Sequence, residues 1–283
     1  MKECLLSDCC ERNAEIDMLV LHCSAYPAAK AIETYREAKV SAHYIIDENG
    51  EIIRLVDEAK AAYHAGVGFW RGRTDSCNMR SVGIELVNMS LGQTPYSEAQ
   101  IAALIPLCKE LMQKYRIAAE NVVGHSDIKP LGKADPGMCF PWQRLAQEGI
   151  GLWYNPADAE KTEENNVSVL LAKVGYNTAD EETTIASAYA FRRRFLPEEV
   201  RIDNDVMHLV DNVYPVGDKS LLSGEKFINC LKAVAYRYET LENSSKGYTL
   251  INERQNRFSR NKVFKLMKNK NEKLINYVLS TIR

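Results

Sequence analysis

The feature that most constrains the fold is a set of short apolar runs that end on polar residues. The run IDMLVLHCS (16–24) is short enough for a buried strand and carries His22 near its end. RSVGIELV (80–87) is a second candidate strand, and NVVGH (121–125) is a third, ending on His125. These runs predict a buried sheet with polar side chains at the strand ends.

Helical and turn patterns separate the runs. Two apolar stretches within 41–56 are joined by Asn49-Gly50, and Asn-Gly is a strong hairpin signal. Ser97 and Gln100 fit a capping box that opens a helix over 98–115. Two further helices are predicted, at 29–38 and over FPWQRLAQEG, which stops at Gly149. Strands mixed with helices predict an α/β fold with a mixed central β-sheet flanked by helices.

The composition changes after this region. A polar, acidic, Pro-bearing stretch reads as a linker, and three amphipathic helical stretches follow, at 167–176, 181–195 and 224–241. We therefore expect a catalytic domain, a linker, a small three-helix domain and a basic tail, over residues 1–153, 154–166, 167–241 and 242–283.

Charge is distributed unevenly along the chain. The formal net charge is −2, but residues 241–283 hold ten Lys/Arg against three Glu and carry +7, which leaves −9 for residues 1–240. A basic tail on an acidic body suggests contact with an anionic polymer or a membrane surface, although a solvated terminal helix explains it equally well. No nucleic-acid partner is expected.

The apolar runs and the cysteines indicate where in the cell the protein is located. No apolar run approaches the roughly 20 residues that span a bilayer, so no transmembrane segment is expected. The N-terminus lacks the pattern of a signal peptide. The eight cysteines are scattered without an even framework, which favours free thiols in a reducing compartment. We expect a cytoplasmic protein, with a periplasmic location or leaderless export as the alternative.

A metal site is indicated by three residues that are far apart in the sequence. A lone histidine at a strand end is usually structural, but His22 and His125 are joined by Asp135 on the turn-rich loop GHSDIKPLGKADPG (124–137). Catalytic zinc sites use three N, O or S ligands and leave a fourth position for water. Two imidazoles and one carboxylate leave a net charge of about +1 to acidify that water. We predict one Zn²⁺ per chain.

Glu85 and Lys133 are the candidate catalytic side chains. Glu85 lies inside an otherwise apolar strand, where it could serve as the general base or form a salt bridge with Arg80 or Lys133. Lys133 precedes Asp135 by two residues and could stabilise an oxyanion, or could be a solvated loop lysine.

Six ordered motifs resemble one known family. The motifs are VLHCSA, VSAHYIIDENGEI, AYHAGVGFWRGR, CNMRSVGIEL, VVGHSDIKP and KADPG. Over about residues 17–150 they are similar to the type 2 N-acetylmuramoyl-L-alanine amidases of the AmpD/AmiD branch, which are related to peptidoglycan recognition proteins. The resemblance implies a zinc enzyme that hydrolyses the bond between muramic acid and L-alanine of the stem peptide. It implies the metal ligands His22, His125 and Asp135, the base Glu85, and a transition-state role for Lys133.

The resemblance also implies substrate contacts. His43 and His64 look like the histidines of the second shell and substrate cleft in the family, and Ala42 stands where phage-type relatives carry a catalytic tyrosine. Asn78 resembles a cleft asparagine. The candidates for meeting a stem-peptide carboxylate are four cations, Lys39, Arg71, Arg73 and Arg80, any of which could equally be a surface residue.

The helical region has a likeness of its own. Residues 170–197 are similar to the peptidoglycan-binding three-helix domain of AmiD-type enzymes, with three consecutive arginines where such domains usually have polar residues. A wall-binding domain favours intact peptidoglycan as the substrate, whereas a cytoplasmic location favours soluble anhydromuropeptides. Two other functions stay open, a phage-type wall lysin and a non-catalytic peptidoglycan-recognition module.

Overall fold

The computed structural model describes residues 1–202, 208–211 and 213–241 of the chain. Met1–Tyr238 forms one compact unit and Glu239–Arg283 is assigned to a second. The predicted basic tail, residues 242–283, lies outside the described residues. In the described part, no helix has the length and apolar character needed to cross a membrane.

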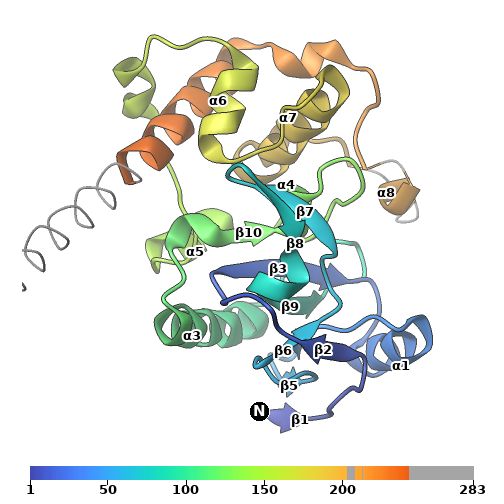
Figure 1. Cartoon of the computed structure of the whole chain (residues 1–283). Helices are drawn as coiled ribbons and strands as arrows, with labels where there is room; N and C mark the ends of the chain where they lie inside the picture. Colours follow the sequence, from blue (N-terminus) through green and yellow to red (C-terminus); the bar gives the residue numbers. More distant parts are fainter. Residues whose placement is uncertain (203–207, 212, 242–283) are drawn as a thin grey trace, which may run out of the picture. The chain divides into compact units, whose positions relative to one another are not determined.

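A six-stranded mixed sheet forms the centre of the first unit (Figure 1). Strands β4 and β5 are the antiparallel hairpin, and every other neighbouring pair in this sheet is parallel. The strands in spatial order are β1 (Lys2–Glu3), β5 (Ile52–Arg54), β4 (Tyr44–Ile46), β9 (Ser81–Val87), β3 (Met18–Ser24) and β10 (Val122–Gly124). The predicted mixed sheet is therefore confirmed.

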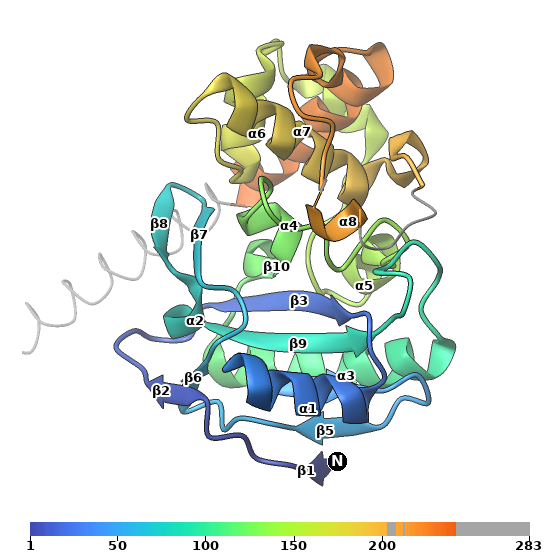
Figure 2. The same ribbon diagram turned by 90° about the vertical axis from the view of Figure 1, so that its right-hand side faces the viewer.

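Helices cover both faces of this sheet. Alternate residues of β3 and β9, such as Leu21 and Ile84, pack against the apolar side of α3 (Glu98–Tyr115) and against α5 (Trp142–Gln147). Helix α1 (Ala28–Ala38) packs on the opposite face. Figure 2 shows α1 in front of β3 and β9 and α3 behind them. Successive side chains of a strand point to opposite faces of the sheet. The remaining residues of β3 and β9 therefore point toward α1.

Two local sequence signals are confirmed by the structure, the Asn-Gly hairpin turn and the capping box of α3. Gly50 adopts φ +83° in the turn between β4 and β5, a conformation that favours glycine. The Ser97 hydroxyl accepts a hydrogen bond from the Gln100 backbone N–H at 3.1 Å, and the Ser97 N–H donates one to Gln100 Oε1. The capping box is therefore present and α3 begins at the predicted residue.

Several short elements complete the region before residue 155. Two small antiparallel ribbons pair β2 with β6 and β7 with β8. The bounds are β2 (Cys9–Glu11), β6 (Lys60–Ala62), β7 (Val67–Trp70), β8 (Arg73–Ser76), α2 (Cys77–Arg80), η1 (Ala119–Asn121) and α4 (His125–Ile128).

The region after residue 155 is helical, as predicted. The polar stretch predicted as a linker contains a short 3-10 helix, η2 (Pro156–Lys161). The remaining elements are α6 (Val167–Val174), α7 (Glu181–Phe195), η3 (Pro197–Glu199), α8 (His208–Asp211), η4 (Lys219–Leu222) and a helix over residues 225–241. The amphipathic pattern predicted for α7 is wrong, because every residue from 183 to 195 is buried. The helix is covered on all sides by α6, η3, η4 and α4.

The packing of α3 on the sheet leads to a stability prediction. Leu104 is fully buried in this core, so Leu104→Ala should lower the free energy of unfolding by about 2–5 kcal/mol. Leu5 is 61% exposed, and Leu5→Ala should change the free energy of unfolding by less than about 0.5 kcal/mol. Urea unfolding of both variants measures the difference. Equal effects would contradict the assignment of α3 to the core.

Candidate active site

Strand pairing brings the first candidate residues together. Strand β3 lies between β9 and β10 and runs parallel to both. His22 is aligned with Glu85 on β9, so their side chains emerge side by side on the α1 face of the sheet. Gly124 is aligned with Leu21, which places His125 just beyond the end of β10 and close to His22.

The loop that carries Asp135 is anchored to the same strand end. The Ser126 N–H donates to the backbone carbonyl of Asp135 at 2.9 Å. A Cβ atom at Gly124 would lie 2.7 Å from Pro136 Cδ, so only glycine lets the loop approach this closely. The Asp135 carboxylate is thereby held beside the two imidazoles.

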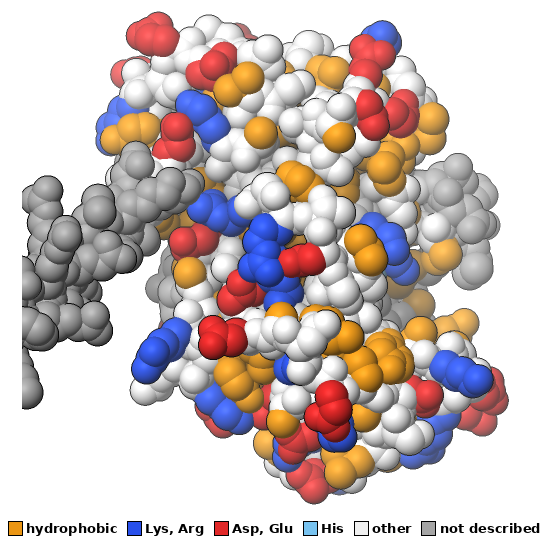
Figure 3. Space-filling model, viewed as in Figure 1, with side chains coloured by type: hydrophobic (Ala, Val, Ile, Leu, Met, Phe, Trp, Pro, Cys, Tyr) orange, Lys and Arg blue, Asp and Glu red, His pale blue; other side chains and the backbone are white. Residues whose placement is uncertain are grey.

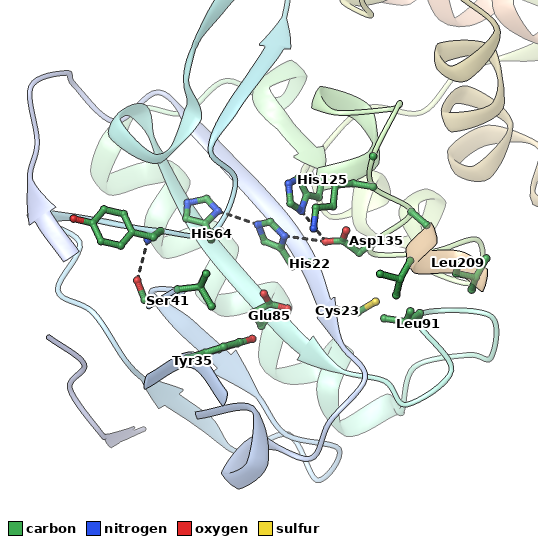
Figure 4. Close-up of a pocket in the computed structure, with 16 residues that line it drawn as sticks. His22, Cys23, Tyr35, Ser41, His64, Glu85, Leu91, His125, Asp135 and Leu209 are labelled. Atoms are coloured by element: carbon green, nitrogen blue, oxygen red, sulfur yellow. Dashed lines mark hydrogen bonds and ion pairs between the residues drawn. The ribbon is translucent and has the colours of Figure 1, made fainter. Parts of the chain in front are cut away.

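The three predicted metal ligands converge, as Figure 4 shows. Asp135 Oδ2 lies 2.9 Å from His22 Nδ1 and 3.2 Å from His125 Nδ1. Candidate ligand atoms of the three residues all lie within 4.8 Å of one another. Both histidines are buried, at 1% and 4% exposed. Among the described residues, they form the group of side chains that could hold a metal ion.

A chain of hydrogen bonds fixes the proton position on His22. The Ser81 hydroxyl has a single proton, and it donates this proton to the Cys77 carbonyl at 2.5 Å. His64 Nε2, 3.1 Å from Ser81 Oγ, must therefore donate to that oxygen. Burial holds the pKa of His64 well below its ordinary value, so the ring is neutral and its Nδ1 accepts a hydrogen bond from the His22 Nε2–H at 2.9 Å.

This chain leaves a lone pair on His22 Nδ1. Burial lowers the pKa of His22 to about 4, so its ring is neutral and Nε2 carries the only proton. The bare Nδ1 then faces the Asp135 carboxylate at 2.9 Å, which places one acceptor opposite another. The donor set therefore fits a divalent cation between the imidazoles and the carboxylate.

Two further residues hold His64 in place. The Asn78 side-chain oxygen accepts from the backbone N–H groups of His64, Ala65 and Gly66 at 3.2, 2.8 and 2.9 Å. A Cβ atom at Gly83 would lie 2.5 Å from the His64 ring, so the ring can rest on β9 only because this position is glycine. Asn78 thus orients the histidine that orients His22.

A cleft of about 280 Å³ opens beside the three candidate ligands. Glu85 and Lys133 line it together with Tyr35 of α1, and Tyr35 is hydrogen-bonded to Glu85. Burial, and then the charge of Asp135, raise the pKa of Glu85 to about 8, against opposing contributions from Tyr35 and Lys133. The salt bridge considered between Glu85 and Arg80 is not formed, because Arg80 pairs with Asp17 at 2.7 Å.

Other predicted substrate contacts lie outside the residues that line this cleft. His43 is fully buried and accepts a hydrogen bond from the Gly83 N–H at 3.0 Å. Lys39 ends α1 as its C-cap. Arg73 is paired with Asp17 and Asp75 at 2.9 and 2.7 Å. On the face shown in Figure 3, basic and acidic side chains lie next to one another in the same way. As substrate contacts these residues, with Asn78, stay predictions.

Sequence reasoning missed Tyr35 and Ser81. Tyr35 lies three and four residues after Ile32 and Ala31, on the side of α1 that packs against the sheet. That spacing was the available signal, since a tyrosine on an apolar helix side brings a hydroxyl to the buried surface. Ser81 gave no signal, because its contact with His64 depends on packing across 17 residues.

Comparison with known proteins identifies the family. The family model described as N-acetylmuramoyl-L-alanine amidase matches residues 12–138. The amidase AmiD of Escherichia coli is 40% identical over 192 residues, covering 59% of this chain and 69% of that protein. The 1,6-anhydro-N-acetylmuramyl-L-alanine amidase AmpD of Enterobacter cloacae is 42% identical over 106 residues, covering 38% of this chain and 55% of that protein.

Solved structures agree with the sequence matches. A complex of E. coli AmiD with the substrate anhydro-N-acetylmuramic acid-L-Ala-D-γ-Glu-L-Lys superposes with a TM-score of 0.63 at 30% identity, covering 80% of this chain and 91% of that one. AmpDH3 of Pseudomonas aeruginosa gives a TM-score of 0.64 at 29% identity, covering 79% and 92%. The chain belongs to the N-acetylmuramoyl-L-alanine amidase family, and it is an amidase.

Proposed function

We propose that the chain is a zinc-dependent amidase that hydrolyses the bond between N-acetylmuramic acid, in its anhydro form, and L-alanine of a stem peptide. The observation that carries the proposal is the convergence of two imidazole Nδ1 atoms on the Asp135 carboxylate, beside Glu85 in an open cleft. The relatives named above act on this class of bond.

Zinc is the cation that this donor set favours. Histidine nitrogen and carboxylate oxygen bind zinc at about 2.0–2.2 Å, so ligand atoms around a tetrahedral ion lie about 3.3 Å apart. The separations of 2.9 and 3.2 Å from Asp135 Oδ2 to the histidine Nδ1 atoms are close to that value. His22, His125 and Asp135 would hold the ion, which supplies Lewis acidity toward water and toward a carbonyl oxygen.

Glu85 is proposed to move the protons of the reaction. It would accept a proton from the attacking water and deliver one to the L-alanine nitrogen as the C–N bond breaks. Lys133 Nζ would donate to the oxygen of the muramyl carbonyl as it gains negative charge. The Tyr35 hydroxyl holds the Glu85 carboxylate toward the cleft. A bound cation would offset the charge of Asp135, which is one cause of the high pKa of Glu85, and would favour the ionised base.

The proposed substrate is a soluble anhydromuropeptide. Two structurally similar amidases were solved with ligands of this class, an anhydromuramoyl tripeptide and an anhydromuramic pentapeptide. The eight cysteines form no disulfide, which suits the reducing cytoplasm that we propose as the compartment. Glycan binding by the helical region, and contact of the tail with an anionic polymer, remain proposals that rest on the sequence likeness and the charge.

A defined substrate tests the proposed reaction. The zinc-loaded enzyme should convert an anhydromuramoyl tripeptide to free peptide and intact amino sugar, as identified by mass spectrometry. A chelator should abolish turnover and added Zn²⁺ should restore it. Insoluble sacculi should release peptide at least tenfold more slowly. Release of peptide from sacculi but not from the soluble muropeptide would exclude the soluble substrate. Binding of the muropeptide without cleavage would favour a recognition module.

Replacement of the proposed base separates catalysis from metal binding. Glu85→Gln keeps the shape of the side chain but cannot accept a proton, so kcat should fall by about 10²–10⁴-fold. Zinc content, measured by atomic emission, should stay near one ion per chain, because Glu85 is not a proposed ligand. Asp135→Ala is the matched variant and should lose the metal. Normal turnover by Glu85→Gln would remove this residue from the mechanism.

The pKa of Glu85 also predicts how stability depends on pH in the metal-free protein. The folded state keeps the Glu85 proton up to about pH 8, whereas an unfolded glutamate ionises near pH 4.3. The folded state therefore binds more protons over this range, and stability should fall as pH rises. Buried His22 and His43, with pKa values of about 4 and 3, contribute equally to the wild type and to Glu85→Gln, so their titration cancels when the two proteins are compared.

Urea unfolding of the metal-free protein at pH 6.5 and pH 8 measures this effect. Between pH 6.5 and pH 8, the free energy of unfolding of the wild type should fall by up to about 2 kcal/mol more than that of Glu85→Gln. Parallel curves for the two proteins would show that the Glu85 carboxyl is already ionised at pH 6.5.

A further inference from the structure

Three consecutive arginines lie in the last turn of α7 and are buried. Arg192, Arg193 and Arg194 are 4%, 4% and 3% exposed. A buried guanidinium is destabilising unless acceptors surround it, so the partners of each arginine show what it stabilises.

Two of the three arginines stabilise the helical region itself. Arg192 Nε donates to Glu199 at 3.0 Å and Nη1 donates to the Leu221 carbonyl at 2.6 Å, with the guanidinium 3.7 Å from the centre of the Phe227 ring. Arg193 donates to the Val213 carbonyl. All of these partners belong to segments that follow α7.

Arg194 instead contacts the segment that carries a candidate metal ligand. Its Nη1 donates to Asp127 Oδ2 at 2.7 Å, and its Nη2 donates to the Val122 carbonyl at 3.2 Å. The guanidinium lies 4.0 Å from the centre of the Trp142 ring. Val122 precedes His125 by three residues and Asp127 follows it by two. One guanidinium therefore bridges the chain on both sides of His125.

The Asp127 carboxylate is the centre of this contact. It is 1% exposed and accepts a hydrogen bond from the Gly124 N–H at 2.8 Å, which closes the turn between β10 and α4. The Tyr176 hydroxyl, also from the helical region, donates to its other oxygen at 2.6 Å. The direction of the His125 ring thus depends on this turn. The charge of Asp127, the buried carboxylate in the turn, is neutralised by Arg194.

We propose that Arg194 is a positioning residue of the metal site, so that the helical region forms part of the scaffold of that site. The inference rests on the proposed function, because it concerns the affinity of His22, His125 and Asp135 for zinc. Residues that orient metal ligands typically change metal affinity by about 10–100-fold when they are replaced.

Arg194→Met tests the proposal, with Arg192→Met as the matched control. Both variants remove from α7 a buried guanidinium that lies over an aromatic ring and pairs with a carboxylate of another segment. Competition with a chromogenic chelator gives the zinc affinity, and thermal melting gives the stability. Both variants should melt at lower temperature, but Arg194→Met should bind zinc about 10–100-fold more weakly. The zinc affinity of Arg192→Met should stay within about threefold of that of the wild type.

Milder variants keep the test decisive if Arg194→Met does not fold. Tyr176→Phe removes one hydroxyl and should lower zinc affinity by a smaller factor. Arg194→Lys keeps the charge but lacks the planar fork of donors that fits both acceptors, so it should retain only part of the zinc affinity. Unchanged zinc affinity in the Arg194 and Tyr176 variants, or an equal loss in Arg192→Met, would overturn the positioning role. A wild type that binds no zinc would instead overturn the proposed function.

Discussion

The candidate active site depends on the central position of β3 between two parallel neighbours. Pairing with β9 places His22 beside Glu85, and pairing with β10 places His125 beside His22. Parallel strands present the same edge of the sheet to solvent, so residues separated by 40 to 100 positions in the sequence reach one cleft. No local interaction could bring these side chains together, and the site therefore exists only when the sheet is formed.

Burial of the polar groups at this end of the strands is destabilising unless they form hydrogen bonds, and the surrounding residues supply those bonds. His64, Ser81 and the Cys77 carbonyl form a chain that leaves His22 neutral with its Nδ1 lone pair toward Asp135. Tyr35 hydrogen-bonds Glu85 from the opposite side. The same contacts that satisfy buried donors and acceptors also set the direction of each functional atom, so stability and chemistry rest on one network.

The helical region has a structural relation to the site that its family likeness does not suggest. A domain that only binds glycan would leave its polar residues exposed, whereas Arg194 and Tyr176 are buried against Asp127. This contact gives one of the three buried arginines of α7 a partner outside the helical region. The first 238 residues accordingly pack as one compact unit.

The sequence by itself determined the elements and the kinds of residue at the site. The hairpin at Asn49-Gly50 and the helix that begins after Ser97 follow from short-range rules, and the structure confirms both. His22, His125 and Asp135 were identifiable because two apolar strands carry a histidine at their ends and a turn-rich loop after the second carries an aspartate, which together match the ligand types of a zinc site. Only the tertiary structure decided that Tyr35 contacts Glu85, that Ser81 contacts His64 and that Arg194 contacts Asp127. It also decided that Lys39 and Arg73 lie outside the cleft lining. Those contacts join segments far apart in the chain, and their partners are fixed by packing, which no local pattern records.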